Sequence, residues 1–483
     1  MLGEKLMGKS IKTIALIAIA IYAPYLAAPI GLTGFAATAF SFVLSTAANA
    51  IIGGMGNDSP GGGGGVQDSG MLVTKQGNVS AIPIIYGARR LGGTRVYIET
   101  TNVSGVTSGT EYLHMVVAFA TGGTRADGTD SLKDITAIRF NDREAWTAAG
   151  GIDSYFSGLI TVKGWLGKRD QTVASPDITA GSFSISADWT ANHRMQGVAY
   201  IYVICKYDRD KIPGAPSIQI ETSGKRIQDV STLGTFSDTT AVMNNPANIL
   251  YDFLTNTTYG KGLAAADLNT ASFIAAKTYA TSAGLTFNGA LSTAETIYNN
   301  TQKLIGCGNM NLVYVNGEYY VQPVKQESFT GAFDFNTSNI LGKWQLALGN
   351  KRSRFNRMKV NFFNPSEEWQ TDNVLIENAT YLSEDSGVVN EKTIELPLLS
   401  DKTLATKVGT YFLNVSRYQT IVSFKSTWEA LQLQVGDPVT ITHEVPGWTL
   451  EKFRVNSITL NSDATVDVIL EQYAPDSVYL ENN

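Results

Sequence analysis

The stretch NPANILYDFLTNTTYGKG, from Asn245 to Gly262, carries the clearest local signals in the chain. Asn245 is a favourable helix N-cap and Pro246 is a favourable first helical residue. Four apolar residues then follow at helical spacing and predict one apolar face: Ile249, Leu250, Phe253 and Leu254. Thr255-Asn256 is expected to end the helix, so this stretch predicts a short helix that packs on another element.

The residues after this helix predict a turn and a second helix. Tyr259, Gly260 and Gly262 supply the turn, because glycine adopts backbone angles that other residues avoid. The Ala-Asp-Leu sequence that ends at Leu268 opens the second helix, which carries Phe273. From these residues alone, the stretch is a helix-turn-helix packed on a sheet.

The composition favours β-structure with many turns. The 483 residues are 43% hydrophobic and 17% charged, with 46 glycines, and this length corresponds to two to four domains. The net charge of −6 gives no overall nucleic-acid footprint. Cys205 and Cys307 are far apart and form neither a metal-binding spacing nor a disulfide framework, so we expect two buried free thiols.

The first 56 residues form an apolar segment, expected to be helical, behind a basic start. No charged residue occurs from Thr13 to Asn57. A secretory signal peptide, a transmembrane anchor, and a segment shielded inside an assembly or meeting a membrane during function all fit this pattern. The large apolar side chains that would line a lumen or contact a membrane are Ile14, Ile17, Ile19, Ile21, Leu32, Phe35, Phe40 and Phe42.

Residues 57–70 form a Gly-rich linker that includes five consecutive glycines, Gly61 to Gly65. No Gly-Lys-Ser/Thr sequence follows them, which argues against a phosphate-binding loop. Beyond the linker we expect a first β region at 71–229, a mixed α/β region at 230–342 and a second β region at 343–483. The fold class is therefore mainly β with a mixed α/β middle.

Apolar runs predict strands through the first β region. Val96 and Ile98 alternate with Arg95, Tyr97 and Glu99, which predicts a half-buried strand. Further strands are expected at 111–120, at 134–140 before an Asn-Asp turn, at 197–206, and around Ile218 and Ile220.

The mixed region and the second β region contain both helix and hairpin signals. Ser292 and Glu295 have capping-box spacing and predict a helix over 293–305. Asn316-Gly317 between alternating runs predicts a hairpin. Beyond these, we expect a helix over 401–415, strands over 357–364, 419–427, 454–460 and 465–472, and a strand from Leu431 that leads through a Gly-Asp-Pro turn into another strand.

Residue spacing indicates no catalytic or metal-binding site. His114, His193 and His443 have no second ligand at a usual spacing, so each is interpreted as a strand or turn residue. Cys307 is expected at the end of a helix, which favours a core position over a nucleophile. Acidic pairs such as Glu367-Glu368 are interpreted as surface acids and not as glycosidase carboxylates. We therefore expect no cofactor, no metal and no enzymatic activity.

A basic cluster lies near residue 355. It contains Lys351, Arg352, Arg354, Arg357 and Lys359, with Phe355 among them. Such a cluster suits contact with phosphate or with an acidic surface. The acidic charge of the whole chain favours a solvated face or a salt-bridge partner for a neighbouring subunit instead.

Several segments together resemble the central tail hub of long-tailed bacteriophages, the family that includes the tip attachment protein of phage lambda. They are, in order, the IIYG at 84–87 with the arginines and glycines of 89–93, the stretch 245–273, the helix and hairpin of 292–323, the strand and turn of 357–365, and the LQVGDPV at 433–439. The motif residues to which we assign structural roles are Tyr86, Gly87, Arg90, Gly93, Pro246, Phe253, Leu254, Tyr259, Gly260 and Gly262.

The resemblance implies a homotrimer at the distal end of a tail tube, with domains that resemble tube-protein β-barrels. Such a hub closes the tube, docks fibres or spikes, and opens for genome ejection. Its implied partners are its own copies, distal tube proteins, the tape-measure protein, fibre or spike proteins, the host membrane during ejection, and DNA in transit. The implied location is the tip of the virion tail, after synthesis in the host cytoplasm. The family has no catalytic residues to transfer to this chain.

Two departures from the lambda pattern add expectations. The sequence stops near the end of the hub part, which assigns receptor recognition to another polypeptide. Three copies of the apolar segment 11–56 would shield one another inside a tube lumen, so we expect this segment to plug the hub or to meet the tape-measure protein. The alternative interpretation is a membrane-anchored surface adhesin with β-rich binding domains.

Overall fold

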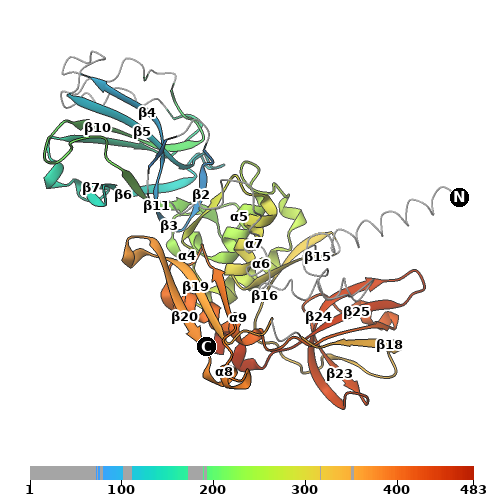
Figure 1. Cartoon of the computed structure of the whole chain (residues 1–483). Helices are drawn as coiled ribbons and strands as arrows, with labels where there is room; N and C mark the ends of the chain where they lie inside the picture. The colour runs from blue at the N-terminus through green and yellow to red at the C-terminus, as the bar shows by residue number, and fades with distance from the viewer. Residues whose placement is uncertain are drawn as a thin grey trace.

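The computed structural model describes residues 72, 74–76, 80–101, 111–171, 189, 193–315, 317–349 and 353–482. The apolar N-terminal segment with its eight named isoleucine, leucine and phenylalanine residues, the Gly-rich linker, Asn316, Lys351 and Arg352 lie outside these residues. No helix among the described residues is long and apolar enough to cross a membrane. Figure 1 shows a β lobe from the first part of the chain, a central helical part, and a second β lobe near the C-terminus.

The first lobe consists of two five-stranded sheets that pack face to face. One sheet has the order β1-β4-β5-β10-β9 and the other has the order β3-β11-β6-β7-β8. Met115, Ile201 and Ile220 belong to the apolar cluster enclosed between them. The strands are β1 (Lys75–Gln76), β3 (Ala88–Gly92), β4 (Thr94–Thr101), β5 (Tyr112–Thr121), β6 (Leu132–Phe140), β7 (Arg143–Thr147), β8 (Gly151–Ile152), β9 (Ile160–Trp165), β10 (Val198–Lys206) and β11 (Ile218–Lys225), with a 3₁₀ helix at Ser154–Phe156.

The alternation in β4 is present, but its apolar side chains lie on the exposed face. Val96 is 45% exposed and Ile98 is 41% exposed, so the strand is half-buried as predicted, with these two side chains on its exposed face. The opposite face of β4 lies on a polar and aromatic layer, where the Tyr97 ring lies 5.3 Å from the Trp189 ring. Thr101 is fully buried in the same layer, with its Oγ1 2.9 Å from the His114 Nε2. The polar side chains on this face are therefore buried together with their hydrogen-bond and ring-contact partners.

The central part contains most of the helices. Strand β2 (Pro83–Tyr86) pairs antiparallel with β14 (Gly289–Ser292), so a strand from the start of the described chain belongs to this part. The other elements are β12 (Ile227–Gln228), β13 (Phe236–Ser237), α4 (Thr240–Met243), α5 (Pro246–Thr255), α6 (Thr270–Ser282), α7 (Ile297–Cys307), and the hairpin of β15 (Met310–Val315) and β16 (Glu318–Pro323), with a 3₁₀ helix at Ala265–Asp267.

Helix α5 begins and ends as its sequence predicts. The Asn245 side chain accepts a hydrogen bond from the Ala247 N–H, Pro246 is the first helical residue, and Asn256 is the C-cap. Every residue from Pro246 to Leu254 is buried, so the helix is surrounded by the central core and does not bury one face alone. This position explains how the polar residue Asp252 of α5 comes to lie inside the protein.

Two helix starts differ from the prediction. Helix α7 begins at Ile297, where the Thr296 side chain accepts from the Asn299 N–H, and Ser292 is the last residue of β14. The capping-box prediction was wrong because Ser292 is held in the β2–β14 pairing. The Ala-Asp-Leu sequence forms a separate 3₁₀ turn, and α6 begins after Asn269, whose side chain accepts from the Ser272 N–H.

The C-terminal part contains two sheets. The three-stranded sheet β20-β19-β21 has α9 packed on it, with Val360 of β19 and Phe412 of α9 in the central core. The six-stranded sheet has the order β17-β23-β24-β25-β22-β18. The elements are β17 (Phe333–Phe335), β18 (Ile340–Ala347), β19 (Arg357–Asn364), β20 (Gln370–Glu377), α8 (Ala379–Glu384), β21 (Glu391–Glu395), α9 (Lys402–Val415), β22 (Ile421–Ser426), β23 (Pro438–His443), β24 (Trp448–Leu460) and β25 (Val466–Gln472), with 3₁₀ helices at Pro365–Glu367, Trp428–Gln432, Asp476–Val478 and Leu480–Asn482.

The predicted strand from Leu431 is not present. Residues Trp428–Gln432 form a 3₁₀ helix, and the next strand begins at Pro438. The alternation in the LQLQV run therefore does not mark a strand: Leu431 is 45% exposed on the 3₁₀ helix. The central core takes residues from all three regions expected from the sequence, including Tyr86, Phe253 and Phe362. The three region borders stay a prediction.

Candidate functional site

A buried charged cluster joins the first lobe to the central helices. Asp252 of α5 accepts hydrogen bonds at its Oδ2 from the hydroxyls of Tyr86 (2.8 Å) and Tyr259 (2.7 Å). Its Oδ1 lies 3.2 Å from the Arg125 Nη1, and both side chains of this ion pair are 8% exposed. Tyr86 and Arg125 come from the first part of the chain, while Asp252 and Tyr259 come from the stretch that decides the central fold. The cluster therefore couples the two parts through one carboxylate.

Lys225 lies beside this carboxylate cluster and is fully buried at the end of β11. Its Nζ donates to the carbonyls of Thr121 (2.5 Å) and Gly122 (3.2 Å) and to the Ser131 Oγ (3.1 Å). The Nζ also lies 5.0 Å from the centre of the Tyr259 ring. Lys225 thus ties the ends of several strands in the first lobe to the turn after α5.

Burial controls the proton affinities of this cluster. Desolvation by burial raises the pKa of Tyr86 and of Tyr259 well above their usual value, and the Asp252 carboxylate adds to both shifts. Burial lowers the pKa of Lys225 to about 7, with a further contribution from the Arg125 charge. Both tyrosines therefore stay protonated as donors to Asp252, while the lysine loses its proton more readily than an exposed one.

The depressed pKa of Lys225 predicts a pH-dependent contribution to stability. In the unfolded chain a lysine has a pKa of about 10.4, so between about pH 7 and 10 the unfolded state binds more protons than the folded state. The free energy of unfolding of the natural chain minus that of a Lys225→Met variant should therefore rise with pH in this window, by at most about 1.4 kcal/mol per pH unit. Urea unfolding of both proteins across this window measures the difference. Two parallel stability curves would contradict the assignment.

Two motif glycines lie where a side chain would meet backbone. Gly87 has a φ of +63°, and a Cβ at this position would lie 2.1 Å from the Phe287 carbonyl oxygen. At Gly260 a Cβ would lie 1.9 Å from the Phe253 carbonyl oxygen. Each glycine follows a tyrosine that binds Asp252, so each allows the close backbone approach that positions that tyrosine.

The remaining motif residues lie elsewhere in the first lobe, in the turn after α5 or in the central core. Gly93 lies against β5, and Gly262 turns the chain with a φ of +72°. Phe253 and Leu254, which follow the start of α5 at Pro246, are buried in the central core. Of the ten motif residues, which belong to two segments of the sequence, the two tyrosines and the glycines that follow them thus lie at this junction.

A second contact links the first lobe to the C-terminal part. Arg89 of β3 lies with its guanidinium carbon 3.5 Å from the centre of the Phe363 ring and 5.4 Å from that of the Trp369 ring. The neighbouring Arg90 binds Glu221 with an Nε–Oε1 distance of 2.9 Å, and its Nη1 lies 3.6 Å from a carboxylate oxygen of Glu368. The end of the β19–β20 hairpin therefore covers two consecutive arginines.

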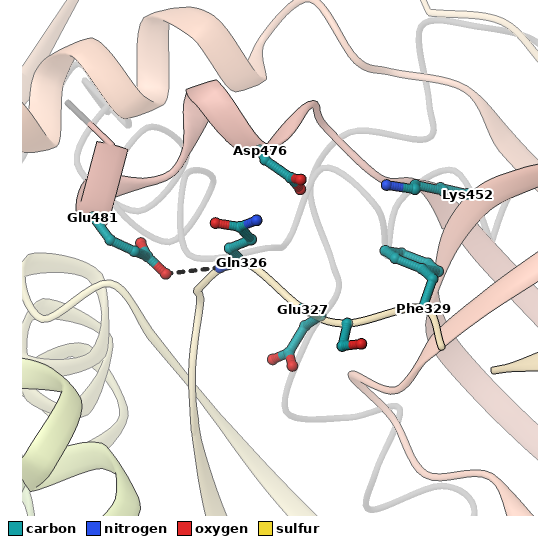
Figure 2. Close-up of a pocket in the computed structure, with 7 residues that line it drawn as sticks. Gln326, Glu327, Phe329, Lys452, Asp476 and Glu481 are labelled. Atoms are coloured by element: carbon teal, nitrogen blue, oxygen red, sulfur yellow. Dashed lines mark hydrogen bonds between the residues drawn. The ribbon is translucent and has the colours of Figure 1, made fainter. Parts of the chain in front are cut away.

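An open groove of about 590 Å³ lies between the central part and the six-stranded sheet. Figure 2 shows its polar lining, in which the Gln326 N–H donates to a Glu481 carboxylate oxygen at 2.8 Å. The residues around it are Gln326, Glu327, Ser328, Phe329, Lys452, Asp476 and Glu481. Three carboxylates and one lysine line this open groove, an arrangement that defines no reaction.

The other candidates from the sequence lie apart from the junction. Cys205 and Cys307 are buried free thiols, as predicted, and burial raises the pKa of each to about 12. His114 is buried in β5, and burial lowers its pKa to about 4. Within the described residues, no group of three or more His, Cys, Asp and Glu side chains is arranged to hold a metal ion.

Of the described residues in the basic cluster, Arg357 forms ion pairs inside the chain. Its partners are Glu377 of the neighbouring β20 and Glu391 of β21. These contacts neutralise part of the cluster within the sheet of the same chain, and the salt bridge to a neighbouring subunit stays a prediction.

Sequence reasoning missed the charged partners at both contacts. Asp252 lies in the predicted helix, between two pairs of apolar residues. Because the core surrounds this helix, the position of the carboxylate in the sequence was itself a signal of a buried partner. Arg89 directly precedes Arg90, one of the motif residues, in the sequence. Arg125 and Lys225 lie in loops and strand ends without any local pattern, so only the three-dimensional structure identifies them.

The protein is therefore mainly β, with several parts that are joined by contacts between charged residues. Comparison with known proteins adds a family match in the C-terminal part. Residues 334–458 match the model of a family described as putative phage tail protein. No curated protein matches the chain.

Solved structures provide a likeness of fold over most of the chain. A chain in the virion of the native gene transfer agent particle has 12% identity and a TM-score of 0.61, covering 87% of this chain and 90% of its own length. The 43 kDa tail protein of prophage MuSo2 from Shewanella oneidensis has 11% identity, 82% and 99% coverage and a TM-score of 0.31. The prophage tail protein gp18 from Listeria monocytogenes EGD-e has 10% identity, 39% and 57% coverage and a TM-score of 0.24. Only the first of these TM-scores indicates a shared fold.

Proposed function

We propose that this chain is a structural virion protein, the homotrimeric hub at the distal end of a phage tail. In this role it closes the tail tube, docks fibres or spikes, contacts the tape-measure protein, and opens for genome ejection; it is not an enzyme. The family match in residues 334–458 supports a place in a tail. The fold shared with a virion chain over 87% of the length supports a structural role.

The observation that carries the trimer is the free edge of the six-stranded sheet. Strand β18 pairs with β22 on one side and, among the described residues, has no strand on its other side. It lies inside the segment with the family match and carries Leu341 and Leu346, which are 36% and 41% exposed. An edge strand with exposed apolar side chains is an open template for pairing. A neighbouring copy that covers this edge would form a heterologous contact, which closes into a ring when the rotation fits.

The full chain is therefore expected to have the mass of a trimer, and a Leu341→Lys, Leu346→Lys double variant is expected to have that of a monomer. Charges on an edge strand oppose pairing with another strand, while the exposed positions leave the fold intact. Light scattering after size exclusion measures the mass. Ile274→Lys on α6 is the matched control, because Ile274 is 37% exposed and lies outside the sheet, so this variant should remain a trimer.

A monomeric natural chain, or a double variant that stays a trimer, would contradict this assembly. The same measurement on a chain that lacks residues 1–70 tests the role given to the N-terminal segment. If residues 11–56 plug the lumen of a ring built by the β lobes, the shortened chain stays folded and trimeric. A shortened chain that unfolds would place the segment in the core and exclude the plug.

A further inference from the structure

Arg89 is a buried cation without a hydrogen-bond acceptor. The residue is 1% exposed, and none of its Nε, Nη1 and Nη2 atoms has a hydrogen-bond partner among the described residues. A buried charge that lacks both water and an acceptor is costly, which is why buried charges in proteins are almost always paired. Arg89 can therefore pair with an anionic group from outside the described residues.

Among the described residues, the compensation around this guanidinium is aromatic. Stacking on Phe363 and the more distant Trp369 provides cation–π attraction, which is stronger when the pair is desolvated. Burial lowers the pKa of Arg89 to about 9. The planar guanidinium matches the geometry of a carboxylate, which accepts two parallel hydrogen bonds from it.

The cover over Arg89 is the short loop at the end of the β19–β20 hairpin. Glu368 and Trp369 in this loop both have left-handed backbone angles, with φ of +57° and +63°, a conformation that is unfavourable for non-glycine residues. The Trp369 N–H donates to the Asn364 carbonyl at 2.8 Å, and the Asn364 side chain accepts from the Ser366 N–H at 3.0 Å and donates to the Asp372 carboxylate at 2.9 Å. The cover is thus a short loop with two strained residues, and hydrogen bonds of Asn364 hold its base.

The chain itself shows which ligand chemistry this place accepts. The Glu368 carboxylate lies at the rim, 3.6 Å from the Arg90 Nη1, and this nitrogen has no hydrogen-bond partner among the described residues. A carboxylate carried on a peptide backbone therefore already approaches the arginine pair in the closed loop, without reaching Arg89. An acidic side chain from another polypeptide would have the same chemistry and a free approach once the loop moves.

We propose that Arg89 and Arg90 form a binding site for an acidic peptide segment of a partner polypeptide, and that the loop containing Glu368 and Trp369 is the lid closed over it. In the open state a partner carboxylate pairs with Arg89, and Trp369 leaves the guanidinium. The site needs no trimer and no tail, so it stands or falls independently of the proposed virion role.

Binding of fluorescein-labelled hexaglutamate to the full chain, followed by anisotropy at low ionic strength, tests this site. Arg89→Gln should weaken binding at least about tenfold, since a charge-assisted pair contributes about 1.5–3 kcal/mol. Trp369→Ala should strengthen binding roughly tenfold, because it raises the fraction of open, competent protein. Arg143→Gln is the matched control: Arg143 stacks on Tyr155 at 3.7 Å in the same lobe, and its loss should leave the affinity unchanged.

A measurement on the natural chain keeps the test independent of how well the variants fold. Saturating hexaglutamate should speed hydrogen exchange at the Trp369 amide, because the hydrogen bond that spans the lid opens. Unchanged exchange at saturation, or equal affinity of the natural chain and Arg89→Gln, would overturn the proposal. Succinate that displaces the peptide at an equal concentration of carboxylate would also overturn it, by showing a site for free anions.

Discussion

Replacing Asp252 with alanine is expected to lower the free energy of unfolding by about 3–5 kcal/mol, the usual result of removing one partner from a buried ion pair. The change leaves the Arg125 guanidinium in a site where its side chain is 8% exposed. It also removes the acceptor of the Tyr86 and Tyr259 hydroxyls. Three donors would then be buried without their carboxylate. Urea unfolding monitored by tryptophan fluorescence measures the loss.

The matched control for this change is Asp238→Ala. Asp238 also forms an ion pair with an arginine, Arg226, but its side chain is 61% exposed, so the loss should be at most about 1 kcal/mol. An Asp252→Ala, Arg125→Met double variant should recover part of the lost stability, because it removes the cation left without a partner. Equal losses for the two aspartates would show that the cluster does not hold the junction.

The strongest local patterns of the sequence predicted their elements correctly. Asn245 and Pro246 start α5, Asp401 caps α9, and the chain turns between β15 and β16 where the Asn-Gly pair predicts a hairpin. Each of these signals acts within a few residues, through one side chain or one backbone angle. Local chemistry alone therefore determines them.

The failures share a cause outside the local sequence. Ser292 has the residue type of an N-cap, but pairing with Pro83 holds it in a strand. The half-buried strand at Val96 and Ile98 was predicted but its buried face was not: an aromatic layer formed with Trp189 and Tyr202 lies on the side opposite these two residues. In both places the partner is distant along the chain, and its contact outweighs the local preference.

The candidate site was predictable in part for the same reason. Tyr86, Tyr259 and the glycines after them were named because they belong to motifs of the family that the sequence resembles, and Tyr259 and Gly260 also have a turn signal. Arg125 and Lys225 have none: their meaning depends on a carboxylate far away along the chain. A charged side chain is interpreted as solvated until the structure shows what surrounds it.

Replacing Gly87 with alanine is expected to lower the free energy of unfolding by about 3 kcal/mol or more, within the long tail of single substitutions. A left-handed backbone costs a non-glycine residue about 1–2 kcal/mol, and Gly87 has a φ of +63°. The added Cβ would also lie 2.1 Å from the Phe287 carbonyl oxygen and 2.4 Å from the Asn288 Oδ1. The backbone on one side must therefore move, which pulls β2 away from β14 and shifts Tyr86 from Asp252.

Gly158→Ala separates the two contributions to this loss. Gly158 has a similar φ of +72°, but no atom of the described residues lies within 4 Å of the position that an added methyl group would take. Gly158→Ala should therefore lower the free energy of unfolding by only about 1–2 kcal/mol, the cost of the left-handed backbone alone. The additional loss in Gly87→Ala measures the cost of the close approach between two parts of the chain. Because that approach positions the Tyr86 hydroxyl, Tyr86→Phe should cost less in the Gly87→Ala background than in the natural chain. Equal losses at both glycines, with additive effects at Tyr86, would mean that the junction does not depend on this contact.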